Sequence, residues 1–232
     1  MTIKEGDFIK LSYTGKLDDG SIFDTTDEEL AKANDLFNEN ALYGGDIIII
    51  GAEQTIEGLE EDIKKHDVGY EGTIEIPPEK GFGEKSPLQI KSIPAKRFEQ
   101  KPHEGMRVQI DGRVGLVIRV MGRHVRVDFN SPMAGKIVYY DYKINDVLEN
   151  IRDKAVGLST LYTGEEMNIE IDGTIAKVQV PSDYSLNQRW MYSRGQMSKD
   201  LLKNTELTEV QLIETYTMDI LKNTPEEEQN SS

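Results

Sequence analysis

The sequence offers few side chains for nucleophilic, metal-assisted or acid–base catalysis. It has no cysteine, and its three histidines, His66, His103 and His124, do not have the spacing of metal ligands. Gly81-Phe82-Gly83 does not match a phosphate-binding loop, and acidic runs such as Glu60-Glu61-Asp62 are typical of solvated helix faces. We therefore predict no metal and no cofactor.

A short helical pattern between two extended runs is the best place for a binding pocket. Residues 55–63 put Ile56, Leu59 and Ile63 on one face and acidic residues on the other. Thr55 can cap this helix at its N-terminus, where negative charge is also favoured. A helix this short is not stable alone in water, so neighbouring strands must cover its apolar face. We predict a sheet wrapped around this helix, with a binding pocket where the two meet.

Strand patterns lie on both sides of the helix and then change in character. Alternating apolar residues predict strands at 8–15 and 71–76, among others. After Gly83 the pattern becomes a series of β-hairpins that ends near Asn130, and the first pattern then resumes at 136–144. We interpret residues 84–130 as a small all-β domain that is inserted into a first domain formed by residues 1–83 and 131–150.

The rest of the chain predicts a C-terminal α+β domain over residues 151–224. A helical pattern through Leu161 precedes a hairpin around Asp172-Gly173, a helix from Leu186 to Lys203 and a last strand at 209–217. The tail, residues 225–232, is acidic and polar, which predicts disorder.

Charge is unevenly distributed in this chain, whose net charge is −15. Residues 84–130 carry 10 basic and 5 acidic residues, whereas residues 1–83 carry 7 and 20. A basic middle segment indicates either a unit with its own surface or chance variation in solvated charge. The acidic balance argues against DNA, although the basic segment could contact RNA or a ribosome. The absence of a membrane-spanning run, a signal-peptide pattern and cysteines favours a cytoplasmic protein.

Four segments, in this order and spacing, resemble the FKBP-type peptidyl-prolyl isomerases. They are Leu11-Ser12-Tyr13-Thr14-Gly15, Phe23-Asp24-Thr25-Thr26, Ile56-Glu57-Gly58-Leu59-Glu60 and Gly81-Phe82-Gly83. Residues 84–130 resemble the insert-in-flap domain of the SlyD-like branch. The chain re-enters the first domain through Asp128-Phe129-Asn130 and Met133-Ala134-Gly135. Residues 151–220 resemble the extra C-terminal unit of the long archaeal members.

The resemblance implies an α+β fold: a five-stranded antiparallel half-barrel on the short helix, an inserted small all-β domain and a C-terminal α+β domain. It also implies a shallow apolar pocket for a proline ring. The catalytic residues that it implies are Tyr13, Asp24, Ile56, Phe82 and Tyr140. The substrate-binding residues that it implies are Phe23, Thr55, Leu59 and Ile47. The backbone N–H of Ile56 is expected to anchor a substrate carbonyl.

Two positions depart from the family pattern. Phe82 replaces a tyrosine whose hydroxyl meets the substrate carbonyl. Another aromatic residue of the pocket is replaced by Asp46, unless a bulge brings Ile47 to that place instead. Both departures bear on the strength and selectivity of proline binding.

The function that the resemblance implies is acceleration of X-Pro isomerisation in folding proteins. This reaction needs no nucleophile, because favouring the twisted amide over the planar one is sufficient. Unfolded or partly folded polypeptides with X-Pro bonds would be the partners, and the inserted domain would hold them as a chaperone does. The alternative is a non-catalytic polypeptide-binding holdase or assembly module with a degraded pocket. In either case, the C-terminal domain is a candidate for homodimerisation.

Overall fold

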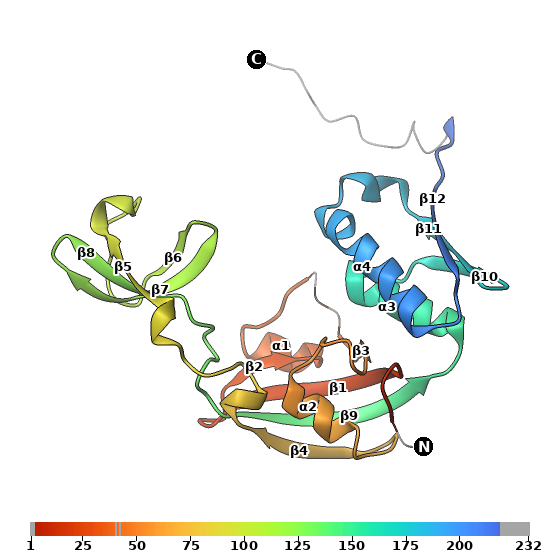
Figure 1. The fold of residues 1–232 in the computed structure, drawn as a ribbon, viewed down its shortest axis with the longest axis horizontal. Helices are drawn as coiled ribbons and strands as arrows, with labels where there is room; N and C mark the ends of the chain where they lie inside the picture. The colour runs from red at the N-terminus through yellow and green to blue at the C-terminus, as the bar shows by residue number, and fades with distance from the viewer. Residues whose placement is uncertain (1–2, 40, 42, 219–232) are drawn as a thin grey trace.

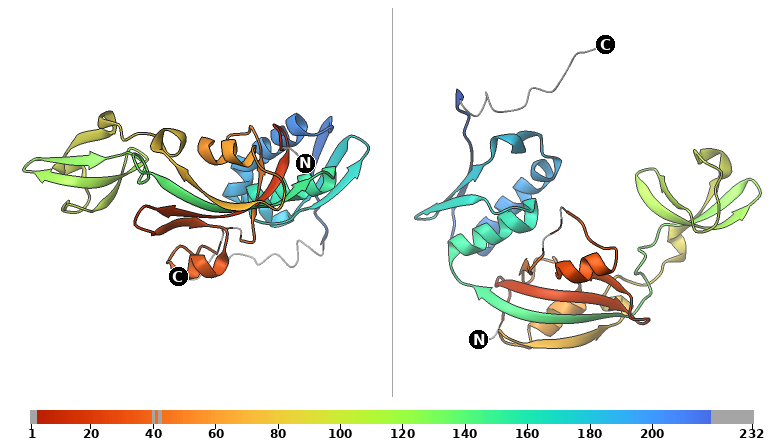
Figure 2. Two further views of the ribbon diagram at one scale, coloured as in Figure 1. Left: turned by 90° about the horizontal axis from the view of Figure 1, so that it is seen from below. Right: turned by 180° about the vertical axis from the view of Figure 1, so that it is seen from behind.

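The computed structural model describes residues 3–39, 41 and 43–218, so the tail predicted to be disordered lies outside the described residues. The strands form three separate sheets. In Figure 1 and Figure 2, the second and third sheets lie beyond opposite ends of the first. Among the described helices, none is long and apolar enough to cross a membrane.

The first sheet has five strands and is antiparallel throughout. Its order is β2-β1-β9-β4, and β3 pairs with β1. The strands are β1 (Phe8–Leu17), β2 (Ile22–Thr25), β3 (Asp46–Ile49), β4 (Glu71–Ile76) and β9 (Val138–Leu148), with the short helix α1 (Glu28–Ala33) between β2 and β3. Strand β9 follows the second sheet in the sequence, and it returns to the first sheet to pair with both β1 and β4.

Helix α2 (Glu57–Ile63) lies against this sheet. Leu59 and Ile63 are fully buried in a core that includes Ile76 and Ile144. The predicted N-cap is wrong by one residue: Ile56 holds that position, and no side chain caps it. Gly58 permits the close approach of helix and sheet, because a Cβ atom there would lie 2.6 Å from Ile76 Cγ2.

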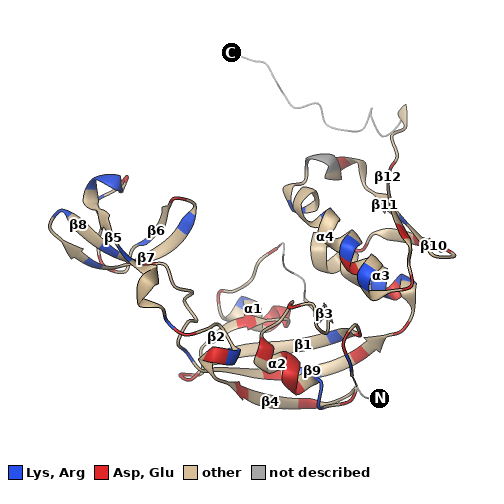
Figure 3. Ribbon diagram, viewed as in Figure 1, with Lys and Arg blue, Asp and Glu red and all other residues tan. Residues whose placement is uncertain are grey.

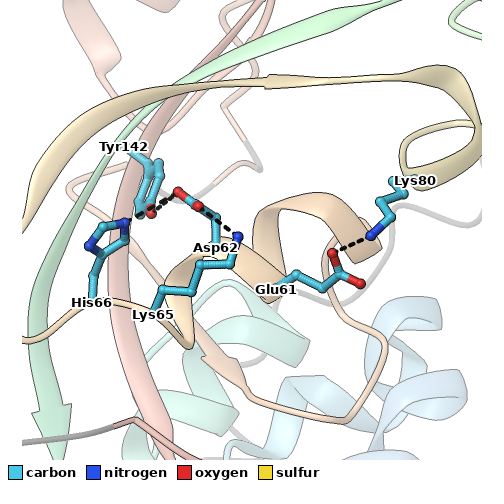
Figure 4. Close-up of polar contacts among 6 residues, drawn as sticks. All are labelled: Glu61, Asp62, Lys65, His66, Lys80 and Tyr142. Atoms are coloured by element: carbon cyan, nitrogen blue, oxygen red, sulfur yellow. Dashed lines mark hydrogen bonds and ion pairs between the residues drawn. The ribbon is translucent and has the colours of Figure 1, made fainter.

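Polar contacts on the other face of α2 fix the helix to the sheet and to the loop after β4 (Figure 4). Asp62 accepts a hydrogen bond from the Tyr142 hydroxyl on β9 at 2.7 Å and pairs with Lys65 at 3.3 Å. Glu61 pairs with Lys80. The acidic helix face that the sequence predicts is therefore partly paired.

The second sheet is a four-stranded antiparallel unit between Ile90 and Asp128. Its strands, in the order β5-β8-β7-β6, are β5 (Ile90–Pro94), β6 (Arg107–Ile110), β7 (Arg113–Met121) and β8 (His124–Asp128). It has its own small core of Ile93, Ile110, Val117, Val125 and Val127. The two segments that join it to the first sheet are bonded to each other, since Asn130 exchanges hydrogen bonds with the Ser86 backbone and Gly135 N donates to Gly83 O at 2.8 Å.

The third sheet packs with two helices after β9. Its strands are β10 (Asn168–Asp172), β11 (Ile175–Val180) and β12 (Glu209–Glu214), and its helices are α3 (Ile151–Thr163) and α4 (Gln188–Asn204). Strand β11 pairs antiparallel with β10 and parallel with β12. The core of this unit includes Trp190 and Leu158, and it also contains Phe8 and Ile49 of the first sheet. The predicted α+β fold class is confirmed.

Two helical glycines allow a matched test of the α2 packing. Gly195 lies in the exposed middle of α4, where an added Cβ atom would meet nothing within 4 Å. Gly195→Ala should therefore stabilise the protein by about 0.5–1 kcal/mol, because alanine costs less backbone entropy in a helix. Gly58→Ala should instead destabilise it by about 1–3 kcal/mol, because the clash with Ile76 outweighs helix propensity. Chemical denaturation measures both changes, and equal effects would contradict the close packing.

Candidate functional site

Four aromatic side chains from distant parts of the chain meet beside α2. Tyr13 on β1 and Tyr140 on β9 have ring centroids 5.7 Å apart. Phe23 on β2 contacts both Tyr140 and Phe82 edge-on, each at 5.8 Å between centroids. Edge-to-face pairs at this spacing are favourable for aromatic rings. The cluster forms a largely apolar wall, in which Tyr140 is buried and the other three rings are half-buried.

The start of α2 adds further predicted residues to this cluster. The fully buried Leu59 and the half-buried Ile56 belong to the same core as the four rings. The Ile56 N–H makes no hydrogen bond to any other described residue, so it is available to a ligand. Thr55 is half-buried in the loop just before it.

Two carboxylates lie at the other end of the cluster. The Tyr13 hydroxyl donates to Asp46 Oδ2 at 3.0 Å. Burial raises the pKa of Tyr13, and the negative charges of Asp46 and Asp24 raise it further, so the phenol stays protonated and serves as a donor. Burial also raises the pKa of the Asp46 carboxyl above its ordinary value. The site therefore has an apolar end at α2 and a polar end at Asp24 and Asp46.

A cavity of about 360 Å³ opens at the polar end. Tyr13, Phe23, Asp24 and Asp46 line it, together with Leu161 of helix α3 and Arg189 of helix α4. Residues of α2 do not line this cavity, so it extends from the aromatic cluster away from the helix.

Ile47 does not join the site, which corrects its predicted place in the pocket. The pairing of β1 with β3 is regular from Phe8↔Ile49 to Leu11↔Asp46, with no bulge. Since side chains alternate along a strand, the residue after Asp46 must point to the opposite face. The Ile47 side chain lies there against Gly157 of α3.

The structure also brings residues to the site that sequence reasoning missed. Leu161 of helix α3 and Arg189 of helix α4 line the cavity. The run of four isoleucines, residues 47–50, was a usable signal, because such runs are typical of strands buried on both faces. That signal predicts a covering element on the second face, although it does not identify the element.

Three family models match consecutive parts of the chain. FKBP-type peptidyl-prolyl cis-trans isomerase matches residues 1–98, FKBP26, IF domain matches residues 91–133, and FKBP26_C-terminal matches residues 151–217. The first match runs from β1 through β5, the second covers nearly all of the second sheet, and the third covers α3 to β12, whereas β9 lies outside all three.

Individual relatives agree with these models. The short-type peptidyl-prolyl cis-trans isomerase of Methanocaldococcus jannaschii is 37% identical over 148 residues, which cover 62% of this chain and 94% of that protein. The FKBP-type 16 kDa peptidyl-prolyl cis-trans isomerase of Escherichia coli K12 is 26% identical over 63% of this chain and 94% of its own. The SlyD isomerase of Helicobacter pylori is 32% identical over 41% of this chain and 55% of its own.

The chain belongs to the FKBP-type family of peptidyl-prolyl cis-trans isomerases, and the predicted family and enzyme class are confirmed. The roles of the individual site residues stay predictions.

The raised pKa of Asp46 leads to a prediction for how the folding stability of the protein depends on pH. Because its pKa is raised in the folded state, the ionised carboxylate costs folding free energy, and that cost appears as pH rises from the ordinary aspartate pKa through the raised value. Asp46→Asn keeps an acceptor for Tyr13 but removes this cost. Its stability relative to the wild type should therefore increase as pH rises from about 3.5 to 7.

Asp172 provides the control with the opposite sign. A hydrogen bond and ion pair with Lys177 lower its pKa, so Asp172→Asn should lose stability relative to the wild type as pH rises. Urea titrations at several pH values measure both trends. Parallel pH profiles for the two variants would contradict the assignment.

Substitution of Phe82 by tyrosine is expected to increase activity. The resemblance implies that a tyrosine hydroxyl at this position would meet the substrate carbonyl, so Phe82→Tyr should raise kcat/KM on an X-Pro tetrapeptide about two- to tenfold, the effect of one added hydrogen bond. Phe98→Tyr, at a residue that packs against the core of the second sheet, is the matched control and should leave the rate unchanged. An unchanged or lower rate for Phe82→Tyr would contradict the proposed position of the substrate carbonyl.

Proposed function

We propose that this protein isomerises X-Pro bonds in folding polypeptides at the aromatic cluster next to α2, and that its second sheet holds those polypeptides nearby. The observation that carries the first part is the convergence of Tyr13, Phe23, Phe82 and Tyr140 beside Leu59 and Ile56. In this proposal the proline ring of the substrate lies among these four aromatic rings, and the Ile56 N–H donates a hydrogen bond to a carbonyl of the substrate.

The chemistry requires only a better fit to the twisted amide than to the planar one. Twisting removes conjugation between nitrogen and carbonyl, which makes the amide less polar, so an apolar wall favours it. Lowering the barrier by roughly 4 kcal/mol gives about a 10³-fold acceleration. The apolar end of the site supplies this environment without any covalent step.

Exposed apolar side chains on the second sheet and in the turn just before it support the holding activity. The most exposed are Leu88 at 84%, Val114 at 66%, Met121 at 44%, Leu116 at 42% and Val120 at 39%. A unit of this size cannot easily bury all of its apolar side chains, and Val114, Leu116 and Val120 of strand β7 stay exposed. Basic residues lie around the same sheet (Figure 3). These five exposed apolar side chains and their basic neighbours, here called the holding surface, suit an unfolded chain with exposed apolar and acidic side chains.

The division into three functional units is part of this proposal. Residues 1–83 with 131–150 would form the isomerase domain, residues 84–130 the holding domain and residues 151–224 the C-terminal domain. A cytoplasmic location fits a partner that acts on newly made polypeptides. Contact of the basic second sheet with RNA or a ribosome remains a prediction.

Homodimerisation through the C-terminal domain also remains a prediction. Strand β12 lies at an edge of its sheet and pairs only with β11 among the described strands. Leu212, Tyr216 and Met218, on and just after this strand, are exposed at 37%, 50% and 68%. An unpaired strand edge with apolar neighbours suits pairing with a second copy.

The alternative is a holdase without catalysis. Two departures from the family pattern favour it: Asp46 stands in place of an aromatic residue, and Phe82 stands in place of a tyrosine. The two functions differ in their response to a short peptide, which needs the proline site but not the holding surface.

A double substitution on the holding surface tests the proposal. Val114→Ser with Met121→Ser should leave the isomerisation of an X-Pro tetrapeptide unchanged and reduce the suppression of aggregation of a refolding protein severalfold, because apolar contact area is lost. Gln109→Ser, at an exposed polar position of β6, is the control and should change neither activity. If the wild type does not accelerate the tetrapeptide at micromolar concentration, the holdase alternative holds. If the double variant still suppresses aggregation, the holding surface is elsewhere.

A further inference from the structure

The C-terminal unit contacts the loop that leads into helix α2. This loop, residues 50–56, connects β3 to α2 and ends at Ile56 of the proposed proline site. Gln54 closes the loop on the β3 side, because its Oε1 accepts a hydrogen bond from the Ile49 N–H at 2.7 Å. Gln54 Nε2 in turn donates to the hydroxyl of Tyr162, on helix α3, at 3.4 Å. One side chain therefore links the loop to the C-terminal unit.

Tyr162 is itself held by helix α4. Its hydroxyl donates to Asp200, whose second carboxylate oxygen accepts from Gln196 Nε2 at 2.8 Å. Asp200 is only 5% exposed, and a buried carboxylate is costly to leave unpaired, so it fixes the direction of the Tyr162 hydroxyl. Arg189 Nε also donates to the Tyr162 carbonyl at 2.9 Å, which holds the end of α3 in place.

Apolar packing places α3 along the same strand that begins the loop. A Cβ atom at Gly157 would lie 2.9 Å from Ile47 Cγ1, so β3 and α3 are in close contact there. Ile49 shares a core with Leu158, and Leu161 lines the cavity that Asp46 also lines. Helix α3 therefore contacts both the strand that carries Asp46 and the loop that carries Ile56.

We propose that Tyr162 and Asp200 are positioning residues for the isomerase: through Gln54 they hold the loop of residues 50–56, and so they set where Ile56 meets the substrate. The inference rests on the proposed role of Ile56. It gives the C-terminal unit a part in the reaction within each chain, separate from any role in assembly.

A double-mutant cycle tests this coupling in the full-length protein. Tyr162→Phe removes only the hydroxyl, and it should lower kcat/KM on an X-Pro tetrapeptide about three- to tenfold, as expected for one lost hydrogen bond. Tyr192→Phe is the matched control, because Tyr192 lies on α4 and is 87% exposed, and it should have no effect. In a Gln54→Ala background, Tyr162→Phe should have no further effect, because its influence passes through Gln54.

The same cycle distinguishes an effect of Tyr162 that passes through Gln54 from a general loss of structure. Loss of activity of equal size with and without Gln54 would overturn the proposal, and so would a Tyr162→Phe variant as active as Tyr192→Phe. The fluorescence of Trp190, the single tryptophan, reports whether the C-terminal core is intact in each variant. If Tyr162→Phe does not fold, Gln54→Ala alone should show the same loss of activity, and full activity in that variant would overturn the proposal.

Hydrogen exchange of the amides that hold the loop keeps the outcome separate from the proposed function. The Ile49 N–H donates to Gln54 and the Ala52 N–H donates to the Ile49 carbonyl, so the positioning role predicts faster exchange at these two amides in Tyr162→Phe than in Tyr192→Phe, whether or not the peptide is turned over. An inactive wild type would remove the proposed catalytic function, and equal exchange in the two variants would remove the positioning role.

Discussion

Strand β3 is buried on both faces, and this double burial joins the proposed proline site to the C-terminal unit. Ile48 faces the core that contains α2, whereas Ile47 and Ile49 face the core that contains α3. Because side chains alternate along a strand, a shift of one residue would exchange the two faces. Such a shift would place the Asp46 carboxylate in an apolar core, which is costly. Two cores therefore hold one short strand in a single register.

The first core was predictable from local patterns. The spacing of Ile56, Leu59 and Ile63 defines one apolar face on a helix too short to be stable alone, so a covering sheet follows from elementary considerations. The meeting of aromatic rings from β1, β2 and β9 was not predictable in this way, because strand pairing between distant segments depends on the whole fold. The resemblance to a known family provided that information.

The second core was harder to predict, for physical reasons. The isoleucine run of residues 47–50 indicates burial on both faces, but any amphipathic helix could cover the second one. The bulge that would have turned Ile47 toward the pocket is absent, because Ile47 packs against Gly157 instead. The hydrogen bonds that connect Gln54, Tyr162 and Asp200 depend on the tertiary placement of three polar side chains, which no local pattern specifies.

The polar end of the site follows from the same constraint on β3. With Ile47 held in the C-terminal core, Asp46 cannot turn away from Tyr13, and its carboxylate becomes a permanent part of the cavity wall. In the proposed function, the twisted amide is stabilised at the opposite, apolar end, among Leu59, Phe82 and Tyr140. The cavity at the polar end would then take the residues that flank the proline rather than its ring. Under this proposal, the packing of the C-terminal unit decides which end of the site holds the isomerising amide and which end contacts only its flanking residues.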